Sequence, residues 1–235
     1  MQDALLVFGA SVRGPGHVRA GLPNQDAYLM FADGPVGGIV LADGLGSCIR
    51  SDTGAKAVCC STMAAMRNRD VAQPFDEDAF LEEIKRGFCV GIDQDAYPDY
   101  MATCLWAFLP GDGKLHFGMI GDGLLAVLTR DGVVVKLSDR KTNSFSNVVS
   151  AISPKITSRD WQVSCLAEDM FLAAVLCTDG ISDDLEDPDG FVRAFVAEYA
   201  SIPDPDSSIA TMLRDWPVPK HTDDKSVVCM ARRGS

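Results

Sequence analysis

The sequence predicts an α+β fold, because its strand-like and helix-like segments are grouped along the chain and do not alternate. Most strand-like segments follow one another through short turn signals, whereas the helix-like segments come in two pairs. Hydrophobic residues make up 47% of the 235 residues, which is enough for a sizeable buried core. We find neither an internal repeat nor a low-complexity linker.

The predicted strands are short runs that are apolar or that alternate between apolar and polar residues. Lys114–Ile120 alternates through Leu115, Phe117 and Met119, the period of a strand. Asp131-Gly132 separates two such runs and predicts a hairpin. The polar stretch Ser138–Arg159 predicts a long loop. The other predicted strands are Ala4–Ser11, Ala27–Ala32, Val36–Ala42, Met101–Leu109, Leu124–Thr129, Val133–Leu137, Trp161–Leu166, Met170–Cys177 and Ser226–Ala231.

The predicted helices show apolar residues on one side and charged residues on the other. Phe80, Ile84 and Phe88 recur every four residues, so we expect this stripe to face the core. Trp106 and Trp161 are also expected in the core. The predicted helices are Asp52–Arg67, Asp76–Asp93, Asp189–Ser201 and Ser207–Trp216.

The net charge and the cysteine content indicate which partners and which cellular compartment to expect. Acidic residues outnumber basic ones by 33 to 21, so we expect no nucleic acid and no membrane partner, since both attract basic surfaces. The eight cysteines lie mostly in apolar runs, without a C-x-x-C pair, which favours a reducing, cytoplasmic setting. No apolar run approaches the roughly 18 residues of a membrane span, and no signal peptide is recognisable, so we expect a soluble protein.

Aspartates recur where the predicted strands begin or end, and glycine follows Asp43, Asp122 and Asp179. A single Asp-Gly is most simply a turn, as we expect at Asp33, Asp112 and Asp131. Several carboxylates on rigid strand ends, however, would form an all-oxygen site suited to Mg²⁺ or Mn²⁺. The strand-end acidic residues are Asp26, Asp43, Asp122, Asp179, Asp183, Asp184, Asp223 and Asp224.

The order of these motifs resembles the type 2C (PPM) metal-dependent serine/threonine protein phosphatases. The resemblance covers residues 9 to 230, and the stretch from His17 to Ala27, together with Gly46-Ser47, is similar to a compact bacterial branch. The motifs are Asn24-Gln25-Asp26-Ala27, Ala42-Asp43-Gly44, Gly121-Asp122-Gly123, Thr178-Asp179-Gly180 and Asp223-Asp224-Lys225-Ser226.

The resemblance implies one phosphatase domain over residues 1–235, built as a sandwich of two antiparallel sheets with helix pairs outside. It further implies two Mn²⁺ or Mg²⁺ ions, with room for a third, that activate water to attack phosphoserine or phosphothreonine. The expected partners are a phosphorylated protein substrate and a serine/threonine kinase. The residues that the resemblance assigns to metal are Asp26 (through water), Asp43, the Gly44 carbonyl, Asp179 and Asp223, with Asp122 and Asp183 at the third site.

This sequence departs from the family pattern around the expected phosphate site. Gly21 stands where the phosphate-binding arginine usually lies, so Arg19 or Arg13 is expected to replace it. Leu45 occupies the place of a common histidine, which leaves His17 as a candidate acid or phosphate contact, or as a structural residue.

Two further departures affect the carboxylate motifs. Gln25 stands where glutamate is common, and Asp224 stands where asparagine is common. Either Asp223 or Asp224 can be the metal ligand, although alignment through Ser226 favours Asp223. The expected catalytic set is therefore Asp43, Asp179, Asp223 and His17.

Other functions remain as alternatives with weaker support. No cysteine has an arginine six positions later, and no D-x-D-x-T/V or nucleotide-binding G-x-x-x-x-G-K-[ST] motif is present. Gln25 and the missing arginine are consistent with a catalytically silent module that binds a phosphoprotein or a regulator. A metal-binding protein without catalysis is a third reading, although no EF-hand spacing supports it.

Overall fold

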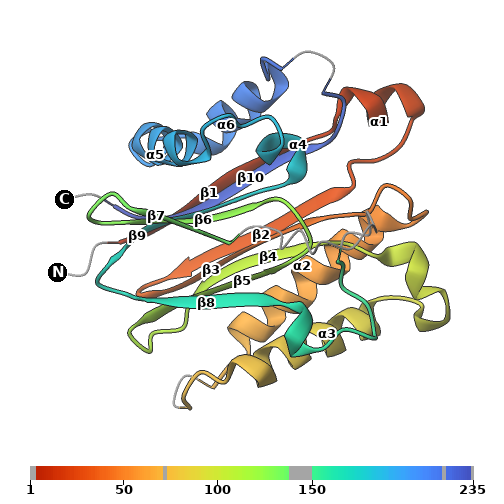
Figure 1. The fold of residues 1–235 in the computed structure, drawn as a ribbon, viewed down its shortest axis with the longest axis horizontal. Coiled ribbons are helices and arrows are strands. Elements are labelled where there is room, and N and C mark those ends of the chain that lie inside the picture. The colour runs from red at the N-terminus through yellow and green to blue at the C-terminus, as the bar shows by residue number, and fades with distance from the viewer. Residues whose placement is uncertain (1–3, 71–72, 138–149, 219–220, 234–235) are drawn as a thin grey trace.

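Two five-stranded antiparallel sheets pack face to face, and helices cover both outer faces (Figure 1). The computed structural model describes residues 4–70, 73–137, 150–218 and 221–233. The first sheet has the strand order β1 (Leu5–Val12), β10 (Lys225–Arg232), β9 (Phe171–Cys177), β6 (Leu124–Thr129) and β7 (Val134–Leu137). The second has the order β2 (Asp26–Asp33), β3 (Val36–Asp43), β4 (Cys104–Leu109), β5 (Lys114–Ile120) and β8 (Gln162–Ala167).

The longer helices lie outside the sheets in two pairs, which confirms the predicted α+β sandwich. Helices α2 (Ser51–Arg67) and α3 (Glu77–Gly91) pack on the second sheet. Helices α5 (Pro188–Tyr199) and α6 (Pro205–Arg214) pack on the first. The short helices are α1 (Pro15–Ala20), η1 (Gln94–Tyr100), η2 (Ser158–Asp160) and α4 (Asp179–Ser182).

Three apolar layers hold the elements together, one between the sheets and one under each helix pair. Because the central strands are covered on both faces, they are largely apolar, and every residue of β4 is buried. The predicted stripe Phe80, Ile84 and Phe88 is buried, and so are Trp106 and Trp161. The hydrophobic effect therefore acts on both faces of each sheet.

The observed elements match the predicted ones, with small shifts at their ends. The Asp131-Gly132 hairpin is confirmed, because β6 pairs with β7 across it. The predicted strand Met101–Leu109 begins only at Cys104, because Ala102 forms isolated bridges with Gly44 and Ile152. The predicted Ser138–Arg159 loop is described only from residue 150 and contains η2; residues 138–149 lie outside the described residues.

The four short helices, α1, η1, η2 and α4, are not predicted by the sequence patterns. Helix α1 has Pro15 at its first turn and ends at Gly21, whose φ of 68° is left-handed. These are ordinary helix signals, but six residues with no buried side chain give no apolar periodicity. Sequence patterns therefore find helices that build the core more readily than helices that shape a site.

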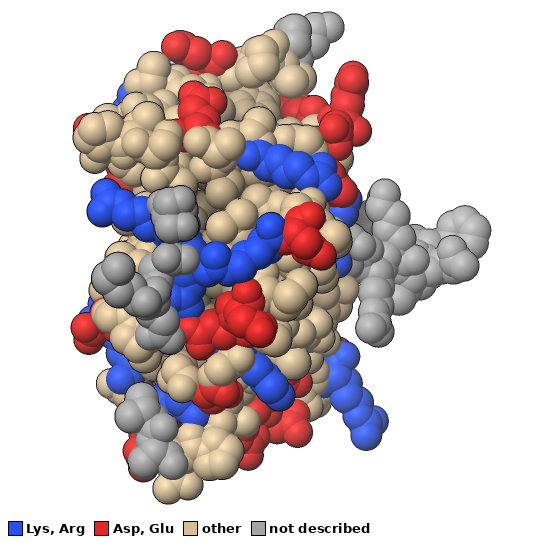
Figure 2. Space-filling model, turned by 90° about the vertical axis from the view of Figure 1, so that its left-hand side faces the viewer, with Lys and Arg blue, Asp and Glu red and all other residues tan. Residues whose placement is uncertain are grey.

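The two chain termini lie at the same end of the sandwich, because Leu5 pairs with Arg232 (Figure 1). From that end, the surface shows acidic and basic side chains interspersed (Figure 2). Strand ends that carry the predicted aspartates, such as Asp26 and Asp43, lie at the opposite end. No helix within the described ranges has the length and apolar character needed to cross a membrane.

We expect Phe88→Ala to lower the free energy of unfolding by about 3–5 kcal/mol, because it opens a cavity under α3. Val90 lies on the same helix but is 80% exposed, so Val90→Ala is a matched control that should change stability by about 0.5 kcal/mol or less. Urea unfolding measures both variants. Equal losses in the two variants would contradict the assigned orientation of α3.

Candidate metal centre

Strand ends from both sheets meet at one pocket. In the antiparallel register of β2 and β3, Asp26 lies opposite Asp43. Asp179 follows β9, and Asp223 precedes β10, the neighbour of β9 in the other sheet. The residues that line the pocket, which has a volume of about 220 Å³, are His17, Gln25, Asp43, Gly44, Leu45, Gly46, Thr103, Asp122, Asp179 and Asp223.

Asp26 joins the two sheets behind this pocket. Its Oδ2 accepts hydrogen bonds from Thr178 Oγ1 at 3.0 Å and from Ser226 Oγ at 2.6 Å, and both hydroxyls belong to the ends of first-sheet strands. Its Oδ1 is buried without a hydrogen-bond partner within the described part of the chain. Because a buried carboxylate oxygen without a partner is costly, this atom is suited to a further donor or a cation.

The backbone around Asp43 is held by Thr103. The Asp43 N–H donates to Thr103 Oγ1 at 2.9 Å, and the Thr103 N–H donates to the Asp43 carbonyl at 2.7 Å. The next residue, Gly44, lies so close to α2 that an added Cβ would be 2.6 Å from the Ser51 carbonyl. The Asp43-Gly44 pair is therefore a rigid strand end, and only glycine fits at its second position.

A tight turn brings Asp122 into the same pocket. Its neighbours Gly121 and Gly123 have φ values of 103° and 104°, which side chains other than glycine rarely adopt. A Cβ on Gly121 would also be 2.5 Å from Thr103 Cγ2. The two glycines in this motif are thus required by the turn that carries Asp122.

Asp179 begins α4 and has a buried Oδ1 that finds no hydrogen-bond partner among the described residues. Asp183 ends the same short helix, where its N–H donates to the Asp179 carbonyl at 3.0 Å. Asp183 does not line the pocket, but burial and then the negative charges of Asp223 and Asp183 raise the pKa of Asp179. The helix therefore places two predicted carboxylates at different depths.

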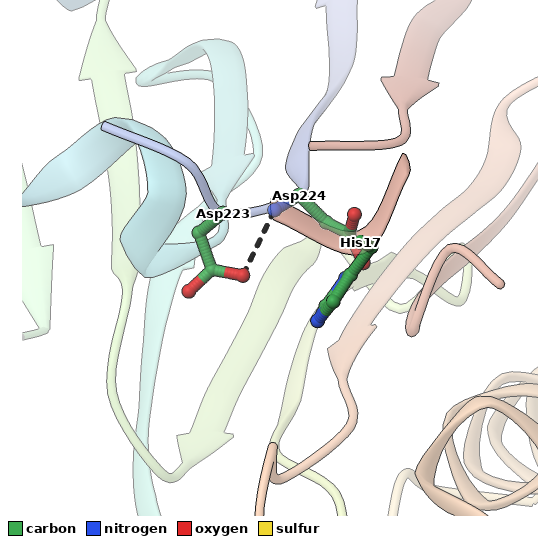
Figure 3. A group of neighbouring side chains, drawn as sticks. All are labelled: His17, Asp223 and Asp224. Atoms are coloured by element: carbon green, nitrogen blue, oxygen red, sulfur yellow. Dashed lines mark hydrogen bonds and ion pairs between the residues drawn. The ribbon is translucent and has the colours of Figure 1, made fainter. Parts of the chain in front are cut away.

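Asp223 and Asp224 lie in opposite environments (Figure 3). Asp223 is exposed and lines the pocket, and its Oδ1 accepts only the Asp224 N–H, at 2.9 Å, within the ranges described. Asp224 is buried, and its carboxylate accepts hydrogen bonds from two backbone N–H groups and from His17. This difference supports Asp223 as the ligand, which stays a prediction.

The predicted phosphate-binding arginines do not line the pocket. Arg13 lies on the surface and donates to the Leu22 carbonyl at 3.2 Å. Arg19 lies near the exposed end of α1. His17, on the same helix, does line the pocket, and it is the only lining residue within the described ranges whose side chain can become a cation.

Crowding of carboxylates raises their pKa values. Burial raises the pKa of Asp26 to about 7, and the charge of Asp224 adds to this effect. Burial, followed by the charges of Asp26 and Asp179, raises the pKa of Asp43 well above its usual range. Burial also raises the pKa of Asp179. These groups therefore repel one another as anions, and a divalent cation would offset that repulsion.

The residues fit Mg²⁺ or Mn²⁺ on two independent observations. The pocket offers carboxylate and carbonyl oxygens, which both ions prefer, and buried Oδ1 atoms of Asp26 and Asp179 have no partner among the described residues. Ligand atoms of His17, Asp223 and Asp224 also lie within 4.8 Å of one another. However, both Asp224 oxygens already accept N–H groups, which disfavours a metal at that second grouping.

Two contributions to the site were not predicted from the sequence. Thr103, which fixes Asp43, is a single hydroxyl within an apolar run, and no local pattern distinguishes it. The sequence predicts Asp224 only as a possible metal ligand, whereas in the structure it is a buried hydrogen-bond acceptor. Both roles depend on contacts between segments that are distant along the chain.

A protein-family model described as Protein phosphatase 2C matches residues 13–216. The chain belongs to the protein phosphatase 2C family. This match covers most of the chain and includes nearly all the motif residues discussed above, while Asp223 and Asp224 follow it. No curated protein matches by sequence.

Several solved structures share the fold of this protein phosphatase 2C chain. A bacterial serine phosphatase has a TM-score of 0.71 at 13% identity, with 99% of both chains covered. Stp1 from Staphylococcus aureus has a TM-score of 0.68 at 14% identity, covering 100% of this chain and 96% of the other. RsbX in complex with magnesium has a TM-score of 0.64 at 13% identity, covering 99% and 97%.

In the metal-free protein, Asp26 should make stability depend on pH. Its pKa is about 7 when folded, against about 3.9 in an unfolded chain, so the folded state binds more protons between these values. The free energy of unfolding should therefore fall as pH rises from about 4 to 7. Relative to wild type, Asp26→Asn should be more stable at pH 7.5 than at pH 5, by roughly 1–3 kcal/mol.

Urea unfolding of both proteins in excess chelator, at pH 5 and pH 7.5, measures this difference. Titrations of groups remote from residue 26 cancel, whereas the pKa of Asp43, which burial and then the Asp26 charge raise, falls in the variant and contributes to the difference. A stability difference that is the same at both pH values would contradict the buried, proton-binding Asp26.

Proposed function

We propose that this chain is a metal-dependent protein phosphatase that hydrolyses phosphoserine and phosphothreonine. The observation that carries the proposal is a pocket lined by several oxygen-bearing residues. Its lining includes Asp43, Asp122, Asp179 and Asp223, together with Gly44. All are oxygen donors on strand ends, turns or a helix start, which are rigid positions for a metal site. Membership of the family and the shared fold support phosphatase activity.

Two Mg²⁺ or Mn²⁺ ions would be held by Asp43, the Gly44 carbonyl, Asp179 and Asp223. Asp26 lies behind Asp43, where its free Oδ1 can accept a hydrogen bond from a water in the pocket. Asp122 and Asp183 are assigned to a third, weaker site. When bound, such ions lower the pKa of water and offset negative charge on the phosphoryl oxygens.

The chain itself positions these groups and shapes the pocket. Thr103 holds the Asp43 backbone, and the hydroxyls of Thr178 and Ser226 orient the Asp26 carboxylate. Leu45 adds an apolar wall in place of a polar side chain. The geometry therefore fixes the carboxylates before any ligand arrives, which reduces the free energy spent on reorganisation.

The pocket charge predicts which conditions allow turnover. A phosphate dianion would be repelled by the lining aspartates, so binding requires cations in the site. Assignment of phosphate contacts to Arg13 or Arg19 stays a prediction. The net charge of -12 favours basic phosphopeptides as substrates. The proposal also includes a partner kinase, a cytoplasmic location and one domain over residues 1–235.

A catalytically silent phosphoprotein-binding module is the second candidate. The observations that favour it are Gln25 in the pocket and the absence of arginine among the described lining residues. The full set of strand-end carboxylates favours the enzyme, because binding alone does not need costly anions crowded in one pocket. Turnover separates the two candidates.

We expect turnover of p-nitrophenyl phosphate and a phosphothreonine peptide with Mn²⁺ or Mg²⁺, and none in chelator. Asp43→Asn should lower kcat/KM by roughly a hundredfold or more, since even residues that only support metal ligands often cost 10–100-fold. Asp33→Asn is the matched control, because Asp33 is exposed at the far end of the same hairpin. It should keep wild-type activity.

Thermal unfolding must show that each variant is folded. A folded wild type that binds the phosphopeptide but turns over neither substrate with either metal would make the silent module the correct reading. Equal losses of kcat/KM in Asp43→Asn and Asp33→Asn would show that the pocket does not take part in catalysis.

A further inference from the structure

Two exposed segments form the rim of the metal pocket. His17 of α1 lines the pocket, and so do Leu45 and Gly46 from the connection between β3 and α2. We call residues 13–22 and 45–50 the rim segments. Helix α1 lies at the end of the sandwich opposite the chain termini (Figure 1). A protein segment is larger than the pocket of about 220 Å³, so the neighbours of a bound phosphorylated residue stay outside it, next to this rim.

Helix α1 is attached to the rest of the fold through its backbone and through His17. The Gly14 N–H donates to Asp224 Oδ1 at 2.6 Å, and the Gly16 N–H donates to the Thr222 carbonyl at 2.8 Å. No side chain of the helix is buried. The fold therefore holds this helix in place without using its apolar side chains.

The rim segments expose apolar side chains on both sides of the pocket. Val18 and Leu22 are 51% and 43% exposed, and Ile49 is 84% exposed. These are three of the seven large hydrophobic side chains that are exposed in the described part of the chain, although the rim segments contain only ten and six residues. Single exposed apolar residues are common, but a group of them around a pocket indicates a binding surface.

The rim segments are also basic. They contain Arg13, Arg19 and Arg50, all exposed, and no aspartate or glutamate. Arg50 already donates to the Tyr100 hydroxyl, but no salt bridge within the described ranges involves Arg13 or Arg19. Arg13 donates to the Leu22 carbonyl at 3.2 Å, which holds its guanidinium beside an exposed apolar residue. Because a guanidinium has five N–H donors, others remain for a carboxylate.

We propose that the rim segments bind the residues next to phosphoserine or phosphothreonine and select protein segments in which these neighbours are acidic and apolar. Val18, Leu22 and Ile49 contact the apolar neighbour, and Arg13 pairs with the acidic one. The inference rests on the proposed phosphatase function and assigns the substrate class of the same site.

The charge of the rim and the charge of the whole molecule act over different distances. Exposed charges are largely screened beyond about 8 Å at physiological ionic strength. The net charge of -12 therefore acts on the approach of a partner, whereas the rim arginines act on the residues in contact with them. The rim thus selects acidic neighbours even though the net charge favours basic peptides.

The test compares kcat/KM at saturating Mn²⁺ for three phosphothreonine peptides. The first carries leucine and glutamate beside phosphothreonine, the second has alanine in place of leucine, and the third has lysine in place of glutamate. We expect the wild type to prefer the first peptide to either of the others by about three- to fivefold, the effect of one buried methylene or one exposed ion pair. p-Nitrophenyl phosphate has no neighbouring residues, so it reports on the pocket alone.

Three variants assign these preferences to the rim. The double variant Val18→Ser/Leu22→Ser should remove the preference for leucine over alanine and leave turnover of p-nitrophenyl phosphate unchanged. Ile49→Ser, in the other rim segment, should lower the same preference about twofold. Arg13→Glu should reverse the preference for glutamate over lysine, because like charges then meet at the rim. The substituted side chains are exposed, and thermal unfolding checks that each variant is folded.

Matched controls lie away from the pocket, near the hairpin between β6 and β7. Val133 is 53% exposed, close to the value for Val18, so Val133→Ser is the apolar control. Arg193 is an exposed arginine that donates to a backbone carbonyl, that of Gly132 at 3.1 Å, as Arg13 does elsewhere, so Arg193→Glu is the charge control. Both controls should keep the wild-type preferences among the three peptides.

Equal rates on the three peptides, or a preference for the lysine peptide, in a wild type that turns over p-nitrophenyl phosphate would overturn this inference and leave the phosphatase function standing. An equal loss on every substrate in Arg13→Glu or in Val18→Ser/Leu22→Ser would also overturn it, because the rim would then act through the pocket. A change of sedimentation in the double variant, with unchanged peptide preferences, would instead make the rim an interface between copies of the chain and overturn the inference. Absence of turnover in folded wild type would overturn both the inference and the proposed function.

Discussion

Repulsion among carboxylates at one end of the sandwich is the constraint on which the rest of the site depends. Asp26 and Asp43 face each other across paired strands, and burial raises the pKa values of both. Such groups stay together only on a rigid frame, which the two sheets, their apolar layers and the Asp26 bonds to Thr178 and Ser226 provide. The stability of the apoprotein and its metal affinity are therefore opposed. A change that separates the carboxylates lowers their repulsion and stabilises the apoprotein, but it also weakens metal binding.

Much of the fold could be predicted because it is written in local patterns. Apolar runs ending in Asp-Gly marked the strand ends, and the Phe80 to Phe88 stripe marked the buried face of α3. The Thr103 hydroxyl and the acceptor role of Asp224 could not be predicted, because each depends on a backbone group brought close only by tertiary folding. Helix α1 could not be predicted for a different reason: a short exposed helix has no hydrophobic periodicity.

Asp223 and Asp224 show how neighbouring identical side chains acquire different chemistry. Successive side chains in an extended segment point in opposite directions, so one carboxylate enters the pocket and the other enters the protein. The inward one is fully engaged by N–H donors, and the outward one remains available at the pocket. Placing a site at the start of a strand thus gives a ligand and its structural support from two consecutive residues.

The hydrogen bonds of Asp26 also determine when, during synthesis of the chain, the site can form. Its partner Ser226 lies 200 residues further along the chain, and the strand that follows Asp224 pairs with the first strand of the fold. A nascent chain on the ribosome cannot form the pocket until β10 has emerged, because Asp223 and the support for Asp26 both arrive last. Unfinished chains therefore contain aspartates of the site but no assembled metal centre. Protein that can bind metal appears only after β10 has been synthesised and the sandwich has closed.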